Sequence, residues 1–316
     1  MKTKHFLINI IIILLFCSFN TIALAQNNDV RLNRTIELLA QGEPTFGIFS
    51  GDRSLNNARS LARSNLDFVL IDMEHGPLDF ETLRIFLLSM TDKRSIMQKG
   101  NLQANVTPIV RLPVNGRENL QFLTKQALDI GSFGVMYPFI STKEEALNAV
   151  RASRYPQKKG ATDFNPPGLR GRAPTNAVWY WGLTSGDYVR RADVWPLDPN
   201  GEILTVIQIE NPEGVNNIEE IISVPGIGAI FVGPSDLGMT MGYPDNPGAP
   251  EIEQAIQKVL KACKKKNIPV GITTGSGNVE RRLKEGFRFV TVGGDGGISP
   301  GTATTLQRGR AASGRE

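Results

Sequence analysis

The chain has 316 residues, of which 41% are hydrophobic and 21% are charged, and its formal net charge at pH 7 is +4. This is the composition of a soluble globular protein, and it excludes fibrous and low-complexity chains. With two cysteines, and with no long basic cluster beyond residues 264–266, the sequence indicates neither a disulfide framework nor a nucleic-acid partner.

The first 25 residues differ from the rest of the chain. Lys2 and Lys4 precede an apolar run over residues 6–19, and residues 23–25 (Ala-Leu-Ala) have the small-residue pattern of a cleavage site. Together these features predict a secretory signal peptide over 1–25 and an exported protein, periplasmic or secreted. The alternative is a retained N-terminal anchor, but the apolar run is short for a stable membrane span.

Signal cleavage changes both the charge and the cysteine count. It removes two lysines and no acidic residue, so the formal net charge falls by 2, from +4 to +2. Cys263 is then the single cysteine, which excludes an internal disulfide. Its helical spacing with the apolar residues 252, 256, 259 and 260 predicts a buried position.

The remainder, residues 26–316, reads as one α/β domain. After a short helix over 30–41, eight strand-like runs rich in apolar and β-branched residues are found at 45–49, 68–72, 108–112, 134–139, 204–209, 229–232, 269–273 and 289–292. Helix-like patterns follow at 54–64, 80–89, 119–130, 142–153, 213–223, 250–266, 279–285 and, more weakly, 302–310. Eightfold alternation predicts a single closed (β/α)₈ TIM barrel, with an open doubly wound sheet as the alternative.

The longest connection, residues 155–201, separates the fourth and fifth strands. It is rich in proline, glycine and arginine over 166–172, and it then carries Trp179, Tyr180, Trp181 and Trp195. Connections of this length are commonly functional. We therefore predict a lid over the active site or a subunit contact, with surface elaboration as the alternative.

Two acidic residues follow neighbouring strands of the predicted barrel. Glu210 ends the fifth strand, and Asp236 closely follows the sixth. Because a right-handed β–α–β crossover makes these strands parallel neighbours, both carboxylates are expected at the same end of the barrel, within reach of one cation. Hard oxygen ligands without Cys or His favour Mg²⁺ or Mn²⁺ over zinc. The spacing fits equally well with each acid capping the helix after its strand.

Four further polar residues fall at or just after strand ends, where barrel enzymes carry their chemistry. His75, the only histidine outside the signal peptide, follows the second strand, and an imidazole is a natural general base near neutral pH. Asp72 is positioned to hold one ring nitrogen of His75, or to serve as a structural acid; Glu74 is the weaker candidate for a ligand or base. Arg111 ends the third strand and needs an anion, either a substrate group or an acid such as Asp72 or Glu210.

Two glycine-containing segments also lie at strand ends. Gly233 permits close approach of a ligand, and the amides of Ser235 and Asp236 are placed to hold a substrate carboxylate, with a tight turn and helix cap as the alternative. The glycine-rich segment 293–297 resembles a phosphate loop only weakly, because it lacks the lysine and spacing of the specific motifs.

Short motifs distributed in order over residues 45–295 resemble one known family. They are FVLIDMEHG at 68–76, VRLP at 110–113, LDIG at 128–131, RYP at 154–156, GLRG at 168–171, IQIE at 207–210, FVGPSDL at 231–237 and GYP at 242–244. Their joint occurrence is similar to the HpcH/HpaI aldolase family, metal-dependent (class II) lyases of 2-oxo acids.

The resemblance implies a barrel that assembles as a homo-oligomer, a trimer or a hexamer with a helix exchanged between subunits. It implies Glu210 and Asp236 as ligands of Mg²⁺, Mn²⁺ or Co²⁺, His75 with Asp72 as the base system, and Arg111 on the enolate. In this resemblance the Ser235 and Asp236 amides hold the substrate carboxylate. The extra segment 91–105 and the enlarged 155–201 connection depart from the family, and we expect both near the aldehyde entrance.

The implied reaction is reversible aldol cleavage of a 4-hydroxy-2-oxo acid to pyruvate, or a related 2-oxo acid, and an aldehyde. Two alternatives remain open from the sequence. One is a lyase of acyl-CoA thioesters similar to the citrate lyase β branch, although no adenine-binding pattern is present. The other is an exported protein that binds oxo acids without turning them over.

Overall fold

The computed structural model describes residues 30–113, 121–294 and 298–315. The predicted signal peptide, the first two residues of the helix predicted at 119–130, and residues 295–297 of the glycine-rich segment lie outside the described residues. In the part of the chain that is described, no helix is long and apolar enough to cross a membrane.

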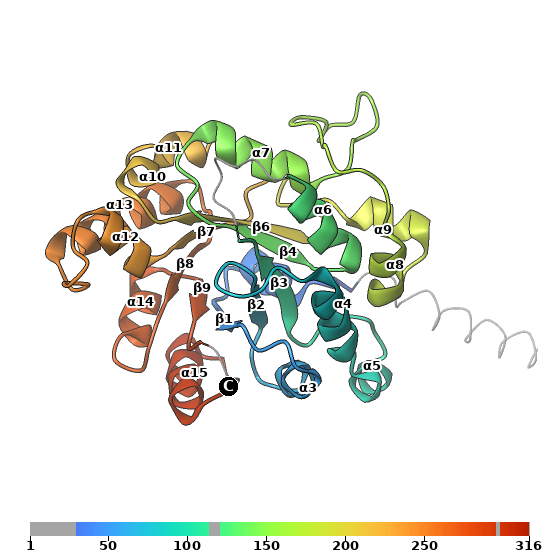
Figure 1. The fold of residues 1–316 in the computed structure, drawn as a ribbon, viewed down its shortest axis with the longest axis horizontal. Coiled ribbons are helices and arrows are strands. Elements are labelled where there is room, and N and C mark those ends of the chain that lie inside the picture. The colour runs from blue at the N-terminus through green and yellow to red at the C-terminus, as the bar shows by residue number, and fades with distance from the viewer. Residues whose placement is uncertain (1–29, 114–120, 295–297, 316) are drawn as a thin grey trace, which may run out of the picture.

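Eight parallel strands close into a barrel, so the predicted (β/α)₈ fold is confirmed (Figure 1). The sheet runs β4-β3-β2-β1-β9-β8-β7-β6, and pairing of β4 with β6 closes it. The strands are β1 (Thr45–Ser50), β2 (Phe68–Asp72), β3 (Thr107–Arg111), β4 (Gly134–Tyr137), β6 (Ile203–Ile209), β7 (Ala229–Val232), β8 (Val270–Thr273) and β9 (Phe289–Thr291). Seven of them are buried along nearly their whole length, as expected when helices cover one face and the barrel interior the other.

Helices surround the strands on the outside of the barrel (Figure 1). Those that follow strands in the manner of the fold are α3 (Leu55–Ala62), α4 (Phe80–Ser89), α6 (Gln121–Ile130), α7 (Lys143–Ser153), α10 (Pro212–Asn216), α11 (Ile218–Ile221), α12 (Pro234–Thr240), α13 (Pro250–Lys265), α14 (Val279–Glu285) and α15 (Pro300–Ser313). The helix predicted at 213–223 is divided at Asn217 into α10 and α11. Cys263 is buried in α13, as predicted.

The N-terminal end of the barrel is filled by the short helix α2 (Arg34–Ala40). Its side chains Ile36 and Leu39 belong to the same buried cluster as the interior residues Phe68, Leu204 and Phe289. Side chains therefore fill the barrel interior at its N-terminal end. The C-terminal end, where the strands finish, is where barrel enzymes carry their active sites.

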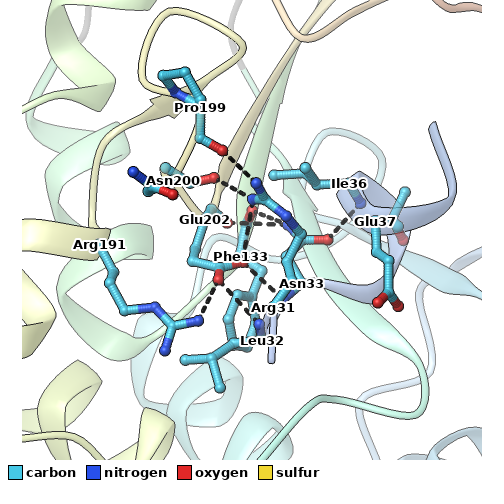
Figure 2. A network of polar contacts seen from close by, with 12 residues as sticks. Arg31, Leu32, Asn33, Ile36, Glu37, Phe133, Arg191, Pro199, Asn200 and Glu202 are labelled. Carbon is cyan, nitrogen blue, oxygen red and sulfur yellow. Dashed lines mark hydrogen bonds and ion pairs between the residues drawn. The ribbon is translucent and has the colours of Figure 1, made fainter. Parts of the chain in front are cut away.

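A polar network fixes α2 in this position (Figure 2). The buried carboxylate of Glu202 accepts hydrogen bonds from the backbone amides of Leu32 (3.0 Å) and Asn33 (2.9 Å). It also forms an ion pair with Arg191 at 2.6 Å. The Asn33 side chain accepts from the amide of Ile36, which caps α2. Glu202 thus joins α2 to the long connection between β4 and β6.

The position predicted for that connection is wrong. Residues 155–201 hold α8 (Thr175–Trp181), α9 (Ser185–Arg191) and a two-residue strand β5 (Val194–Trp195), none of which we predicted as an element. Trp181 stacks on Phe133 (ring centroids 4.3 Å apart) and donates a hydrogen bond to the carbonyl of Gly131, both just before β4. The segment leads from the end of α7 to the start of β6, so it lies at the N-terminal end and is no lid over its own barrel mouth.

The extra segment 91–105 was likewise misplaced. It contains α5 (Lys93–Lys99) and connects the end of α4 to the start of β3. Its Ala104 amide donates to the carbonyl of Leu32, and the Gln103 side chain donates to the carbonyl of Arg31. The segment therefore packs against the residues just before α2, at the N-terminal end of the barrel. The reason is connectivity, because a helix-to-strand segment begins and ends at the N-terminal face of the barrel.

Candidate active site

The predicted site residues lie at or just after the C-terminal ends of neighbouring strands. Asp72 ends β2 and Arg111 ends β3, where the two are direct register partners. Glu210 follows β6, and Gly233 follows β7 and caps the helix that carries Ser235 and Asp236. The parallel barrel therefore brings residues from widely separated parts of the sequence to one rim.

Asp72 and Arg111 form a buried, two-point ion pair. The Arg111 Nε donates to Asp72 Oδ1 at 3.0 Å, and its Nη2 donates to Oδ2 at 2.5 Å. Arg111 also stacks on the ring of Phe49, 4.5 Å from its centroid. Burial acts to raise the pKa of Asp72, but the hydrogen bond and charge of Arg111 prevail, so its pKa lies below the ordinary value. Of the partners the sequence left open for Arg111, the structure shows Asp72.

The predicted pairing of Asp72 with the ring of His75 is therefore wrong. Asp72 Oδ1 instead accepts from the backbone amides of Glu74 (3.0 Å) and His75 (3.4 Å), which fixes the turn after β2. A guanidinium held in register on the next strand offers charge and two donors, and this outweighs one imidazole nitrogen. The His75 side chain is 63% exposed at the barrel mouth, where its Nε2 lies 3.8 Å from Glu74 Oε2.

Glu74, the weaker candidate from the sequence, lies inside the site. Its Oε2 is 2.9 Å from Arg111 Nη1, so the same oxygen faces both the guanidinium and the His75 ring. Burial raises the pKa of Glu74, the charges of Arg111 and His75 oppose the rise, and the carboxylates of Asp72 and Asp236 add to it. The sequence signal for Glu74 is an aspartate two residues before it, because the Asp72 carboxylate accepts from the Glu74 amide and fixes the turn after β2.

Glu210 is the most enclosed acid of the site, with 1% of its surface exposed. Its Oε2 accepts from the Phe139 amide at 3.3 Å, and its Oε1 accepts from Gln208 Nε2 at 2.5 Å. Burial, together with the nearby charges of Glu74 and Asp236, raises the pKa of Glu210 to about 8. Burial and the neighbouring acids thus disfavour the charged form of Glu210 more than the charge of Arg111 favours it.

Gly233 is required by the position of Glu210. A Cβ atom on residue 233 would lie 2.1 Å from Glu210 Oε1, which is shorter than any permitted van der Waals contact. Pro234 then begins α12, and no side chain caps the helix start. Ser235 is exposed in this first turn, and Asp236 is half-buried beside it.

The acids at the rim outnumber the cations. Asp72 and Glu74 share Arg111, whereas Glu210 and Asp236 form no ion pair with a basic side chain of the described residues. Gln208 Oε1, next to Glu210, is buried without a hydrogen-bond partner in this part of the chain. In residues 30–113, 121–294 and 298–315 no three His, Cys, Asp or Glu side chains gather tightly enough to enclose a metal by themselves.

Comparison with known proteins now identifies the family. The family model described as HpcH/HpaI aldolase/citrate lyase matches residues 45–299. The chain belongs to this family. The resemblance inferred from the motifs is confirmed.

Named relatives agree with this assignment. The chain is 33% identical over 274 residues to a 5-keto-4-deoxy-D-glucarate aldolase of Escherichia fergusonii, covering 86% of this chain and 94% of the relative. The structure of a family protein from Burkholderia cenocepacia J2315 is 29% identical, with a TM-score of 0.70 over 88% of this chain and 96% of that one. An HpcH/HpaI aldolase from Desulfitobacterium hafniense DCB-2, 22% identical with a TM-score of 0.65, covers 87% of this chain and 93% of its own, and shares the fold.

The family assignment fixes the class of chemistry. The protein is an aldolase, a carbon–carbon lyase. Members of this family are typically dependent on a divalent metal. The roles of the individual residues at the rim remain predictions, which the geometry above now constrains.

Proposed function

We propose that this protein reversibly cleaves a 4-hydroxy-2-oxo acid to pyruvate, or a related 2-oxo acid, and an aldehyde. The observation that carries the proposal is the convergence of Glu74, Glu210 and Asp236 with Arg111 at the rim of the barrel. The Escherichia relatives are named for 5-keto-4-deoxy-D-glucarate, and this compound is the first substrate to test.

The acids present fit a divalent cation. Glu210 and Asp236 are the proposed ligands, because neither forms an ion pair with a basic side chain in the described residues, and the charge of Asp236 raises the pKa of Glu210. Two carboxylates leave coordination positions for water and substrate oxygens, as Mg²⁺ and Mn²⁺ prefer. When bound, the cation supplies Lewis-acid polarisation of a carbonyl oxygen. Mg²⁺, Mn²⁺ and Co²⁺ are the candidates.

We assign substrate binding and proton transfer to the side chains and amides of the rim. Arg111 has five N–H donors and commits three to Asp72 and Glu74, so it keeps donors for the substrate's keto oxygen. His75 takes the proton of the 4-hydroxyl group as the C3–C4 bond breaks, and Arg111 stabilises the enolate that remains. The amides of Ser235 and Asp236 hold the substrate carboxylate. Protonation at C3 completes pyruvate.

The test is turnover with and without metal. Purified protein is incubated with pyruvate and a panel of aldehydes, and the aldol products are identified by mass spectrometry. EDTA is expected to abolish product formation, and Mn²⁺, Mg²⁺ or Co²⁺ to restore it. Glu210→Gln and Asp236→Asn are expected to weaken Mn²⁺ binding in calorimetry and to remove turnover. Full activity in either variant, or in EDTA, would refute the metal assignment.

The same assay separates the two alternative functions. Pyruvate binding without product from any aldehyde would favour a non-catalytic oxo-acid binder. Product formation from an acyl-CoA thioester but not from free aldehydes would favour the acyl-CoA lyase. The aldol proposal requires that product appears with free aldehydes alone.

Two further parts of the proposal concern the whole molecule. We propose that the protein is exported through the signal peptide at residues 1–25, and N-terminal sequencing of protein from the periplasm or medium tests this. We propose that it forms a homo-oligomer, a trimer or a hexamer, which light scattering coupled to size exclusion tests. A cytoplasmic chain with residues 1–25 intact, or a monomer, would contradict the respective part.

A further inference from the structure

The two segments that depart from the family, 91–105 and 155–201, each expose a large apolar side chain. Met97 on α5 is 82% exposed and Trp179 on α8 is 79% exposed, more than any other large hydrophobic side chain of the described residues. Single exposed apolar residues are common on protein surfaces, but two of this size on neighbouring segments indicate an interaction surface. Neither side chain takes part in the chemistry proposed above.

Helix α5 is held by its caps rather than by packing. None of its residues is buried. The Asp92 carboxylate accepts from the amides of Arg94 (3.1 Å) and Ser95 (3.4 Å) at the start, and Gly100 ends the helix in the left-handed conformation with φ 68°. The stability of a helix normally comes from the packing of its apolar face, which α5 lacks. Its outer side chains, Met97 among them, are therefore open to a partner.

Trp179 points away from the barrel. Ala177 and Trp181, two residues before and two residues after it, are the buried residues of α8. Because an α-helix turns by about 100° per residue, position 179 lies on the side opposite to both. Trp181 stacks on Phe133 and holds the helix against the barrel. The exposed indole of Trp179 therefore adds nothing to the core.

Met97 and Trp179 belong to one surface. Helices α5 and α8 lie on the same side of the barrel (Figure 1). Leu102, which follows α5, is so close to the end of α8 that a Cβ on Gly182 would lie 3.1 Å from its Cδ1. Residues of both segments also line one small cavity of about 60 Å³. We use the name α5–α8 surface for the surface formed by Lys93, Arg94, Met97, Lys99, Leu102 and Trp179.

The α5–α8 surface is positively charged. Lys93 and Arg94 are exposed, and neither forms an ion pair with an acid of the described residues. Lys99 donates to uncharged oxygens of the chain that follows α5. Asp92, which precedes these residues, is already paired with Arg63 at 2.9 Å. The surface therefore combines exposed apolar side chains with uncompensated cations.

The described chain begins beside this surface. The Gln103 side chain donates to the carbonyl of Arg31 at 2.9 Å, and Arg191 at the end of α9 donates to the carbonyl of Val30 at 2.9 Å. Residues 26–29 alone separate Val30 from the expected cleavage site. A signal peptide enters a membrane during export. The predicted signal peptide therefore joins the domain close to the α5–α8 surface.

We infer that the α5–α8 surface binds the surface of a membrane that contains anionic phospholipids. Trp179 lies at the level of the headgroups, where tryptophan is enriched, with Met97 beside it. Lys93 and Arg94 bind lipid phosphates, because basic residues close to an anionic bilayer are attracted to it. The inference gives the enzyme a location and does not depend on its aldol chemistry.

A lipid surface fits these residues better than a second copy of the same surface. Two copies face to face would bring like charges together without acids to compensate them. An anionic bilayer supplies the opposite charge. Its interface also accepts an indole and a thioether without the matching pocket that a protein partner must provide.

Vesicle binding tests the inference. Protein that lacks residues 1–25, the form expected after export, is centrifuged with vesicles of phosphatidylcholine alone or of an equimolar phosphatidylcholine–phosphatidylglycerol mixture. The variants are Lys93→Gln with Arg94→Gln, Met97→Ser with Trp179→Ser, and Trp179→Phe. Tryptophan fluorescence is recorded in parallel, and Trp179 is its exposed reporter.

Matched controls come from the opposite end of the barrel. Met239→Ser removes a methionine that is 59% exposed on α12, and Lys143→Gln removes an exposed lysine at the start of α7. Both should bind vesicles as wild type does. Circular dichroism and thermal unfolding verify that each variant is folded.

Wild type is expected to bind the mixed vesicles at least about 10-fold more tightly than the neutral ones. Replacing Lys93 and Arg94 should weaken binding to the mixed vesicles about 10- to 30-fold, at about fivefold per charge, and added KCl should weaken binding of wild type. Replacing Met97 and Trp179 by serine should weaken binding about 10-fold. Trp179→Phe should keep binding within about threefold, because its ring still reaches the headgroups, but should lose the blue shift that vesicles cause in wild type.

Three results would overturn the inference. The first is the absence of wild-type binding to the mixed vesicles. The second is binding that the charge and apolar variants leave unchanged. The third is an oligomer that dissociates in light scattering when Met97 and Trp179 are replaced, because the surface would then be a subunit contact. Aldol turnover is measured separately, so none of these results bears on the proposed function.

Discussion

Truncation of Glu202 offers a quantitative test of how α2 is held at the N-terminal end of the barrel. Glu202→Ala removes the acceptor of the Leu32 and Asn33 amides and the ion-pair partner of Arg191. The Glu202 side chain is 2% exposed, so the groups it leaves behind are poorly hydrated. Breaking a buried pair from one side costs about 3–5 kcal/mol. That is a large share of a typical folding free energy of about 5–15 kcal/mol.

Urea unfolding measures this cost, as a lower midpoint at unchanged slope. A Tm decrease of about 6–10 °C should accompany it, at about 2 °C per kcal/mol for a chain of this size. Hydrogen exchange over residues 30–41 should rise, because α2 loses its anchor. The control is Glu219→Ala, whose ion pair with Lys265 is exposed on both sides and is worth at most about 1 kcal/mol. A loss of unfolding free energy for Glu202→Ala no larger than that of the control would refute this account of how α2 is anchored.

Two further predictions concern the rim and the acid stability of the barrel. Gly233→Ala should displace the Glu210 carboxylate and weaken Mn²⁺ binding about 10- to 100-fold, the range for disturbing a ligand's support; an unchanged Kd in calorimetry would contradict this. Hydrogen bonding to Arg282 lowers the pKa of Glu253 to about 2 from 4.5. Because the folded-state pKa is depressed, the stabilisation is present above about pH 4.5 and is lost towards pH 2. Wild type should therefore lose more unfolding free energy than Glu253→Gln between pH 5 and pH 3 in urea titrations; parallel curves would contradict it.

The barrel could be predicted because its strands are buried on both faces. Continuous apolar runs such as 204–209 and 229–232 indicate buried parallel strands when they alternate with amphipathic helices. The structure places β6 over Ile203–Ile209 and β7 over Ala229–Val232, within one residue of prediction. The two-residue β5 could not be found in this way, because it has too few residues to show a period.

The site could be predicted only as far as chain order determines it. Residues that follow strands must lie at one rim, so Asp72, Arg111, Glu210 and Asp236 were placed together correctly. Which of them touch depends on strand register and side-chain direction. Asp72 and Arg111 are register partners across β2 and β3, a relation between two strands that neither segment reveals alone. Sequence proximity suggested His75 as the partner instead.

Buried acids at the two ends of the barrel have different charged neighbours, and this contrast argues for function at one of the ends. At the N-terminal end, Asp67 is fully buried and forms ion pairs with three arginines, Arg34, Arg310 and Arg315. At the C-terminal end, Glu210 is equally buried but faces further carboxylates, and its pKa is raised. Folding alone favours the first arrangement, since an uncompensated buried charge costs stability. An excess of acid that is retained at the rim, on the side where barrel enzymes react, supports a bound cation as its counterpart.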